Sequence, residues 1–213
     1  RAGRGDGFGR PRARVLKVRH SLRPVLVLAS GQALFQIASV MVMTVGGLAG
    51  AQLAGSARWA TLPIAAMFLG TALATFPASM WMARAGRRTG FIAGTLLGAA
   101  GGALAALAIS RSSILLLSAG TFLVGTYQGF AQFYRFAASE MAEEAHRPRA
   151  ISLVLAGGVL AAIVGPQLAR VGGPLLSPEY VGTFLILSVV SLGATAVLAQ
   201  LSPIPPSGQS RPV

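Results

Sequence analysis

The feature that most constrains this chain is a series of six long apolar runs. They cover roughly residues 24–54, 60–83, 90–110, 113–137, 150–171 and 180–201, and hardly any charged residue interrupts them. About 20 apolar residues in a helix cross the hydrocarbon core of a bilayer, which is about 30 Å thick. Only 11% of the residues are charged, whereas about one quarter is usual in soluble domains. We therefore predict an all-α transmembrane protein with a six-helix bundle over residues 24–201.

Basic residues are distributed unevenly among the segments outside these runs. The segment before the first run, the links after the second and fourth runs, and the segment after the last run carry 14 of the 18 arginine and lysine residues. The other links carry only Arg58, Arg111 and Arg170. Because positively charged loops stay on the cytoplasmic side, we expect both termini to be cytoplasmic. Residues 1–23 then form a basic arm, and residues 202–213 form a Pro- and Ser-rich tail.

The formal net charge of +13 could also indicate a nucleic-acid-binding protein. Arginines beside a first membrane span are explained by orientation and by attraction to anionic lipid, which is worth about 1 kcal/mol per residue near the surface. Phe8 is the single Phe, Tyr or Trp residue in the arm, so aromatic residues do not interleave repeatedly with the basic ones, as they do in many nucleic-acid-binding segments. The bilayer is therefore the expected partner of the arm, and we expect no nucleic acid.

Few residue types that carry catalysis or bind metals are present. The chain has no cysteine, its single aspartate is Asp6 in the arm, and its histidines, His20 and His146, lie near the predicted inner surface. No Ser, His and acid set shares a place in the bundle, and no metal-ligand spacing appears. Neither a carbonyl filter sequence nor a ring of acids within the runs indicates a channel. We therefore expect no enzyme, no metal and no cofactor.

Small residues recur at helical spacing in three of the runs. They are Gly90, Gly94, Gly98 and Gly102 in the third run, Gly70, Ala74 and Ala78 in the second, and Gly157, Ala161 and Gly165, followed by Pro166, in the fifth. Small residues allow transmembrane helices to approach closely, and this spacing puts each series on one helix face. Glycine and alanine are frequent in this chain, so a single series could reflect composition. Four glycines in register nevertheless predict a packing surface.

Polar residues form a stripe in the fourth run, with a smaller counterpart in the first. Gln128, Gln132 and Arg135 are spaced i, i+4 and i+7 and share one helix face. Polar side chains at membrane depth usually face the bundle interior or a water-filled cavity. We predict that the following side chains line a solute path: Gln32, Gln36, Tyr127, Gln128, Gln132 and Tyr134. The alternative is that the glutamines join helices, at about 0.6 kcal/mol each, and that Arg135 extends to the inner surface.

A charged cluster lies at the predicted cytoplasmic end of the bundle. Glu140 follows the fourth run, and its carboxylate could pair with one of the three arginines between the second and third runs. We assign the following residues to a candidate cytoplasmic gate: Arg84, Gly86, Arg87, Arg88, Arg135 and Glu140. A solvated charged loop is the alternative.

Several motifs resemble those of the major facilitator superfamily. The stretch "MARAGRRTGF", residues 82–91, is similar to its signature Gly-x-x-x-Asp-Arg-x-Gly-Arg-Arg. "YQGFAQ" in the fourth run, "SEMAEEAHRPRAIS" before the fifth and "GPQLA" within the fifth also resemble segments of that family. More narrowly, "QFYRFAASE" and "RAISLVLAGGV" are similar to a bacterial branch that includes proposed riboflavin transporters. The sequence departs from the signature at two positions: Ser79 replaces the signature glycine, and Ala83 replaces the signature aspartate.

The resemblance covers the N-terminal half of a facilitator and implies a bundle built as a 3+3 inverted repeat. It implies that a small organic solute moves by alternating access, in the inner membrane of a bacterium, between this half and a second one. Gly125 stands where many members have an arginine linked to proton coupling, so proton coupling is not implied.

The partner of this half is open at the level of the sequence. Because the chain begins with Arg1, we expect a processed form or a portion of a longer protein. The second half could be a separate chain, the remainder of the same protein or a second copy in a homodimer. Alternatively, the half has become a non-transporting structural or assembly subunit of a larger membrane complex.

Overall fold

The computed structural model describes residues 11–201, and for residues 11–22 and Ala57 it describes the backbone alone. Within this range the chain is helical and contains no strand. The α-helices are α1 (Pro11–Ala54), α2 (Leu62–Ala85), α3 (Arg87–Ser110), α4 (Ile114–Ala131), α5 (Tyr134–Met141), α6 (Arg147–Gly172) and α7 (Val181–Leu198). Six stretches, with α4 and α5 counted as one, are long and apolar enough to cross a membrane. The prediction of an all-α bundle with six spans is confirmed.

Helix α1 does not stop at the predicted boundary between arm and bundle. It runs over 44 residues from Pro11 and passes through Pro24 without interruption. At 1.5 Å per residue it is about 66 Å long, more than twice the roughly 30 Å of hydrocarbon, so it extends well beyond the membrane. Pro11 suits the first turn, where the backbone N–H has no intrahelical partner. The first ten residues of the arm and the predicted tail lie outside the described residues.

The fourth run was predicted as one helix over residues 113–137, and the structure corrects this to two. At the end of α4 the Phe133 N–H donates to the Phe130 carbonyl at 3.2 Å, which makes a tighter turn than an α-helix. The ladder resumes at once, because the Ala137 N–H donates to the Phe133 carbonyl at 3.0 Å. Helices α4 and α5 therefore follow one another closely and together make one span.

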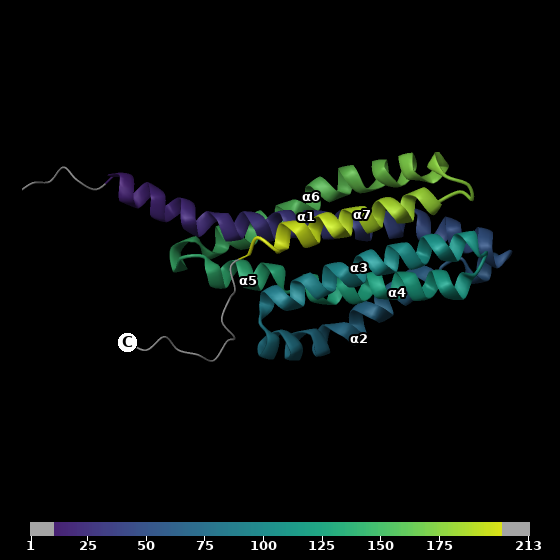
Figure 1. The fold of residues 1–213 in the computed structure, drawn as a ribbon, viewed down its shortest axis with the longest axis horizontal. Helices are drawn as coiled ribbons and strands as arrows, with labels where there is room; N and C mark the ends of the chain where they lie inside the picture. Colours follow the sequence, from purple (N-terminus) through teal and green to yellow (C-terminus); the bar gives the residue numbers. More distant parts are fainter. Residues whose placement is uncertain (1–10, 202–213) are drawn as a thin grey trace, which may run out of the picture.

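The helices pack in a repeated pattern. Helix α4 packs against α2 and α3, α1 packs against α6 and α7, and α3 packs against α7. If α1 is exchanged with α4, α2 with α6, and α3 with α7, the same set of helix pairs results. This correspondence between the two groups of three helices is expected of the 3+3 inverted repeat. Helix α1 begins, and α7 ends, at the same end of the bundle (Figure 1), which an even number of crossings requires. That this end is cytoplasmic stays a prediction.

The predicted glycine series of the third run packs against three neighbouring helices. An added Cβ at Gly94 would lie 2.7 Å from Phe130 Cβ of α4, and one at Gly102 would lie 2.5 Å from Ser188 Oγ of α7. At Gly90 it would overlap the side chain of Met82 in α2, and at Gly98 the ring of Tyr127 in α4. In the structure, the absence of side chains at these four positions lets other helices contact α3.

The series in the fifth run packs α6 against α1. A Cβ at Gly157 would lie 3.0 Å from the Ala29 carbonyl oxygen, and one at Gly165 would lie 2.7 Å from Val40 Cγ1. Pro166 follows within α6. Both glycines thus lie at the contact that repeats the α2 and α4 contact on the other side of the bundle.

The tightest approach in the bundle joins α2 and α4. A Cβ at Gly125 would overlap the Met67 carbonyl oxygen, and one at Gly70 would overlap the Phe122 carbonyl oxygen. Backbone therefore meets backbone at this crossing, where a side chain has no room to turn away. The sequence analysis identified Gly70 but did not single out Gly125 for packing, although Gly129 follows it at the i+4 spacing.

Candidate functional site

Polar side chains from three helices gather around one partly open hollow of about 200 Å³, which we call the glutamine pocket. Its lining comprises Gln32, Phe35 and Gln36 of α1, Gln128 and Ala131 of α4, Gln132 in the turn after α4, Arg135 of α5, and Leu155 of α6. All four glutamines are half-buried. The four amides predicted for a solute path thus lie around a single hollow, together with one guanidinium group.

Helical spacing puts these residues on facing sides of α1 and α4. Gln32, Phe35 and Gln36 follow at i, i+3 and i+4, so that all three lie on one side of α1. Gln128 and Gln132 are one turn apart, and the backbone at Gln132 stays in the right-handed helical region, with φ −54° and ψ −24°. Arg135 therefore lies on the same side as Gln128 and Gln132, although it belongs to α5.

The amide of Gln128 has one protein partner. Its Oε1 accepts a hydrogen bond from Thr71 Oγ1 of α2 at 3.3 Å. The same hydroxyl also lies 3.1 Å from the carbonyl oxygens of Met67 and Gly125, and it has a single proton to donate. Thr71 was not expected from the sequence, since a threonine among apolar residues of α2 carries no distinguishing pattern.

The other three glutamines of the pocket have no such partner in the described part of the chain. None of its hydrogen bonds reaches a side chain of Gln32, Gln36 or Gln132, and none joins one glutamine to another. Glutamines that hold helices together would be expected to bond across the helix interface. These amides instead leave donors and acceptors free toward the hollow.

The two tyrosines expected on the solute path lie elsewhere. Tyr127 and Tyr134 are both fully buried, and neither lines the glutamine pocket. The ring of Tyr127 packs edge-on against Phe35 at 5.3 Å between centroids, and the ring of Tyr134 packs against Phe91 at 4.7 Å. The Tyr127 ring also lies against Gly98 of α3, and Phe91, the neighbour of Tyr134, belongs to the same helix. The expectation for these residues is corrected: they belong to the core behind the pocket.

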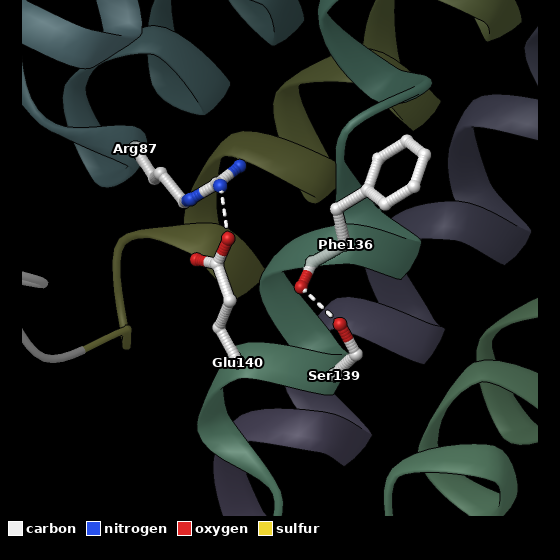
Figure 2. Close-up of polar contacts among 4 residues, drawn as sticks. All are labelled: Arg87, Phe136, Ser139 and Glu140. Carbon is white, nitrogen blue, oxygen red and sulfur yellow. Dashed lines mark hydrogen bonds and ion pairs between the residues drawn. The ribbon is translucent and has the colours of Figure 1, made fainter. Parts of the chain in front are cut away.

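An ion pair joins the start of α3 to α5 at the arginine-rich end of the bundle. Arg87 Nη2 donates to Glu140 Oε1, and Figure 2 shows the two side chains pointing toward one another. One residue earlier on α5, the Ser139 hydroxyl donates to the Phe136 carbonyl at 2.8 Å (Figure 2). Of the three arginines that the sequence offered to Glu140, the structure pairs it with Arg87. The role of this pair as a gate stays a prediction.

The remaining residues of the candidate gate do not form one cluster. Arg88 Nη2 donates to the Ala199 carbonyl at 2.7 Å and so joins α3 to the end of α7. Arg84 is exposed on the last turn of α2. Gly86 separates α2 from α3 with a φ of 88°, a left-handed conformation that favours glycine. Arg135 lines the glutamine pocket, with its guanidinium carbon 5.0 Å from the ring centroid of Phe136.

A small hollow lies at Ser79 and Ala83, the two positions that differ from the family signature. It measures about 120 Å³, and Ser79, Ala83, Arg87 and Phe133 are among the residues that line it. Ala83 occupies the position of the signature aspartate, so Arg87 has no carboxylate from α2 beside it. Glu140 of α5 supplies the carboxylate instead.

We expect Glu140→Gln to alter the position of α5 much more than the stability of the fold. The Glu140 side chain is 49% exposed, and exposed ion pairs contribute at most about 1 kcal/mol. Because the chain has no cysteine, spin labels on cysteines introduced at Thr89 and Met141 can report the separation of α3 and α5. The distance distribution should broaden toward longer values.

Glu144→Gln is the matched control, because Glu144 lies 3.9 Å from Arg147 in its own segment and does not join α5 to α3. The double exchange Arg87→Glu with Glu140→Arg should restore the original distribution. An unchanged distribution in Glu140→Gln would show that the ion pair does not hold α5.

The chain matches the Major Facilitator Superfamily over residues 28–213. It is 39% identical over 180 residues to the riboflavin transporter RfnT of Brucella anthropi, an alignment that covers 84% of this chain and 45% of that protein. It is 31% and 29% identical over 160 residues to the uncharacterized MFS-type transporters YdeG and YddS of Bacillus subtilis, covering 73% of this chain and 37% of each. The chain thus spans less than half the length of these relatives. With six apolar helices and this match, the chain is an integral membrane protein that belongs to the Major Facilitator Superfamily.

Proposed function

We propose that this chain is one half of a transporter that moves a small organic solute by alternating access, together with a second six-helix half. The observation that carries the proposal is the glutamine pocket, where the half-buried amides of Gln32, Gln36 and Gln132 face a hollow and have no hydrogen bond among the described residues. An amide that is not bonded within the protein can donate to and accept from a polar solute that enters the hollow.

The lining favours a polar solute. Amide groups donate and accept hydrogen bonds, and Arg135 adds a cation to the pocket. The similarity to a protein named as a riboflavin transporter makes riboflavin the first solute to test, because its ring system is planar and carries several acceptors and donors.

A second half is required because the glutamine pocket is open on one side. Facilitator halves form their solute site at the interface between the two repeats. The second half could be another part of the same protein, a separate chain or a second copy. The relatives that the chain matches are more than twice as long as the matched region, which supports a half within a full-length transporter.

The test is to purify the intact particle in mild detergent, measure its mass and composition, and then assay uptake of labelled riboflavin into proteoliposomes. We expect two six-helix halves and uptake that saturates with solute concentration. A lone copy held among unrelated subunits, without uptake, would contradict the proposal and favour the alternative of a structural subunit.

A further inference from the structure

A second hollow lies on the other side of α4 from the glutamine pocket. It measures about 420 Å³, and its lining includes Leu73, Pro77 and Trp81 of α2, Leu97 of α3, and Phe122 and Phe130 of α4. We call it the α2–α3 groove. Phe130 stands two residues after Gln128 and so lies on roughly the opposite face of α4. The groove is therefore separate from the proposed solute path.

The groove opens outward between two helices. Helices α2 and α3 both pack along α4 but contact one another far less, so that α4 forms the floor between them. On the α2 side, Leu73 is 59% and Trp81 is 42% exposed. A groove that opens at the outer surface of a transmembrane bundle, away from the pocket, is accessible to lipid.

The lining offers nothing polar to an occupant. Besides apolar residues it contains Thr126, whose hydroxyl donates to the Phe122 carbonyl of its own helix at 3.1 Å. From Gly70 to Trp81 the groove follows about 16 Å of α2 at 1.5 Å per residue. Half of the hydrocarbon core is about 15 Å thick, so the groove matches the hydrocarbon of a single leaflet.

A cation lies beyond the end of this apolar surface. Arg84 follows Pro77 and Trp81 at i+7 and i+3, on the same side of α2, and it is exposed. Unlike Arg87, Arg84 has no carboxylate within ion-pair distance in the described part of the chain. Tryptophan and arginine are the residues expected at the boundary between hydrocarbon and headgroups.

We propose that the α2–α3 groove binds an acyl chain of an anionic phospholipid from the leaflet on the arginine-rich side, with Arg84 at its phosphate. The occupant is apolar over the length of the groove and negatively charged at the end where the arginine lies. This inference does not depend on the proposed transport function.

Trp81 can report the occupant directly. The chain has two tryptophans, and the other, Trp59, lies in the link between α1 and α2. Two variants are compared: one carries Trp59→Phe, and the other carries both Trp59→Phe and Trp81→Phe. The difference between their fluorescence is the signal of Trp81, because the fluorescence of any tryptophan in a partner protein is the same in both and is subtracted. These particles are titrated in mixed micelles with phosphatidylglycerol or phosphatidylcholine brominated on the acyl chains, since bromine quenches tryptophan on contact.

We expect phosphatidylglycerol to quench Trp81 at an about fivefold lower mole fraction than phosphatidylcholine, because one arginine near the surface contributes about 1 kcal/mol toward an anionic lipid. Arg84→Gln should abolish this preference, whereas Arg111→Gln, at the opposite end of the bundle, should keep it. Leu97→Phe partly fills the groove and should weaken quenching by both lipids. Leu96→Phe, next to it but 47% exposed and outside the lining, should not.

Three results would overturn the proposal. Equal quenching by the two lipids in the parent would mean nonspecific contact with bulk lipid. A preference that persists in Arg84→Gln would exclude the arginine as its source. Absence of quenching by either lipid would mean that protein covers the groove. Arg84→Gln changes an exposed side chain, so the test stands even if Leu97→Phe fails to elute as a monodisperse particle.

Discussion

Replacing Gly125 with alanine is expected to destabilise the bundle by about 3 kcal/mol, at the upper end of the range for overpacked interiors. The new Cβ would overlap the Met67 carbonyl oxygen. A flexible side chain could turn away, but this oxygen belongs to the backbone of α2 and moves only if α2 and α4 separate. For a chain of this size, such a loss should lower the Tm by about 6–12 °C, measured by circular dichroism in detergent.

Gly193→Ala is the matched control for this substitution. Gly193 lies within α7, and an added Cβ would meet nothing within 4 Å. Since alanine is favoured over glycine in a helix by up to about 1 kcal/mol, this variant should be as stable as the parent or slightly more so. Equal Tm values for the two variants would show that the crossing of α2 and α4 tolerates a wider separation than the structure has.

The double substitution Gln128→Leu with Gln132→Leu is expected to abolish uptake of riboflavin while the bundle still folds. Leucine has a similar size, and both glutamines are only half-buried, so packing should change little. The solute, however, would leave its own polar groups unpaired in the pocket, at about 1–3 kcal/mol each. Two such groups correspond to an about 100-fold loss of uptake, measured as the initial rate with labelled riboflavin in proteoliposomes.

Gln167→Leu tests whether the loss is specific to the pocket. Gln167 is exposed on α6 and does not line the glutamine pocket, so uptake should be unchanged. Elution volume and Tm report folding in each variant. Normal uptake by the double variant, from a particle whose parent transports riboflavin, would reject the glutamine pocket as the solute path.

The sequence predicted the architecture because hydrophobic length determines which segments can cross a bilayer. Six runs of sufficient length led directly to the six spans. The predicted helix ends were less accurate. Helix α1 begins at Pro11, within the predicted arm, because arginines and lysines are good helix formers and a charged segment can continue a helix beyond the membrane.

The site was only partly predictable for a different reason. Spacing along α4 correctly grouped Gln128, Gln132 and Arg135, but it could not show which neighbour each face of the helix meets. Tyr127 is adjacent to Gln128 in sequence and turns toward Gly98 of α3 instead of the pocket. Similarly, Gly125 and Gly129 have the spacing of a packing pair, but the sequence could not show that this face of α4 meets the backbone of α2.

Helix α5 carries the two charged side chains that belong to different parts of the site. Arg135 lies at the glutamine pocket and Glu140 pairs with Arg87, five residues apart or about 7.5 Å along the axis. Both side chains stand on one helix of eight residues, so a rigid shift of α5 would move the two groups together. We therefore expect a solute bound in the glutamine pocket to change the separation of Glu140 and Arg87.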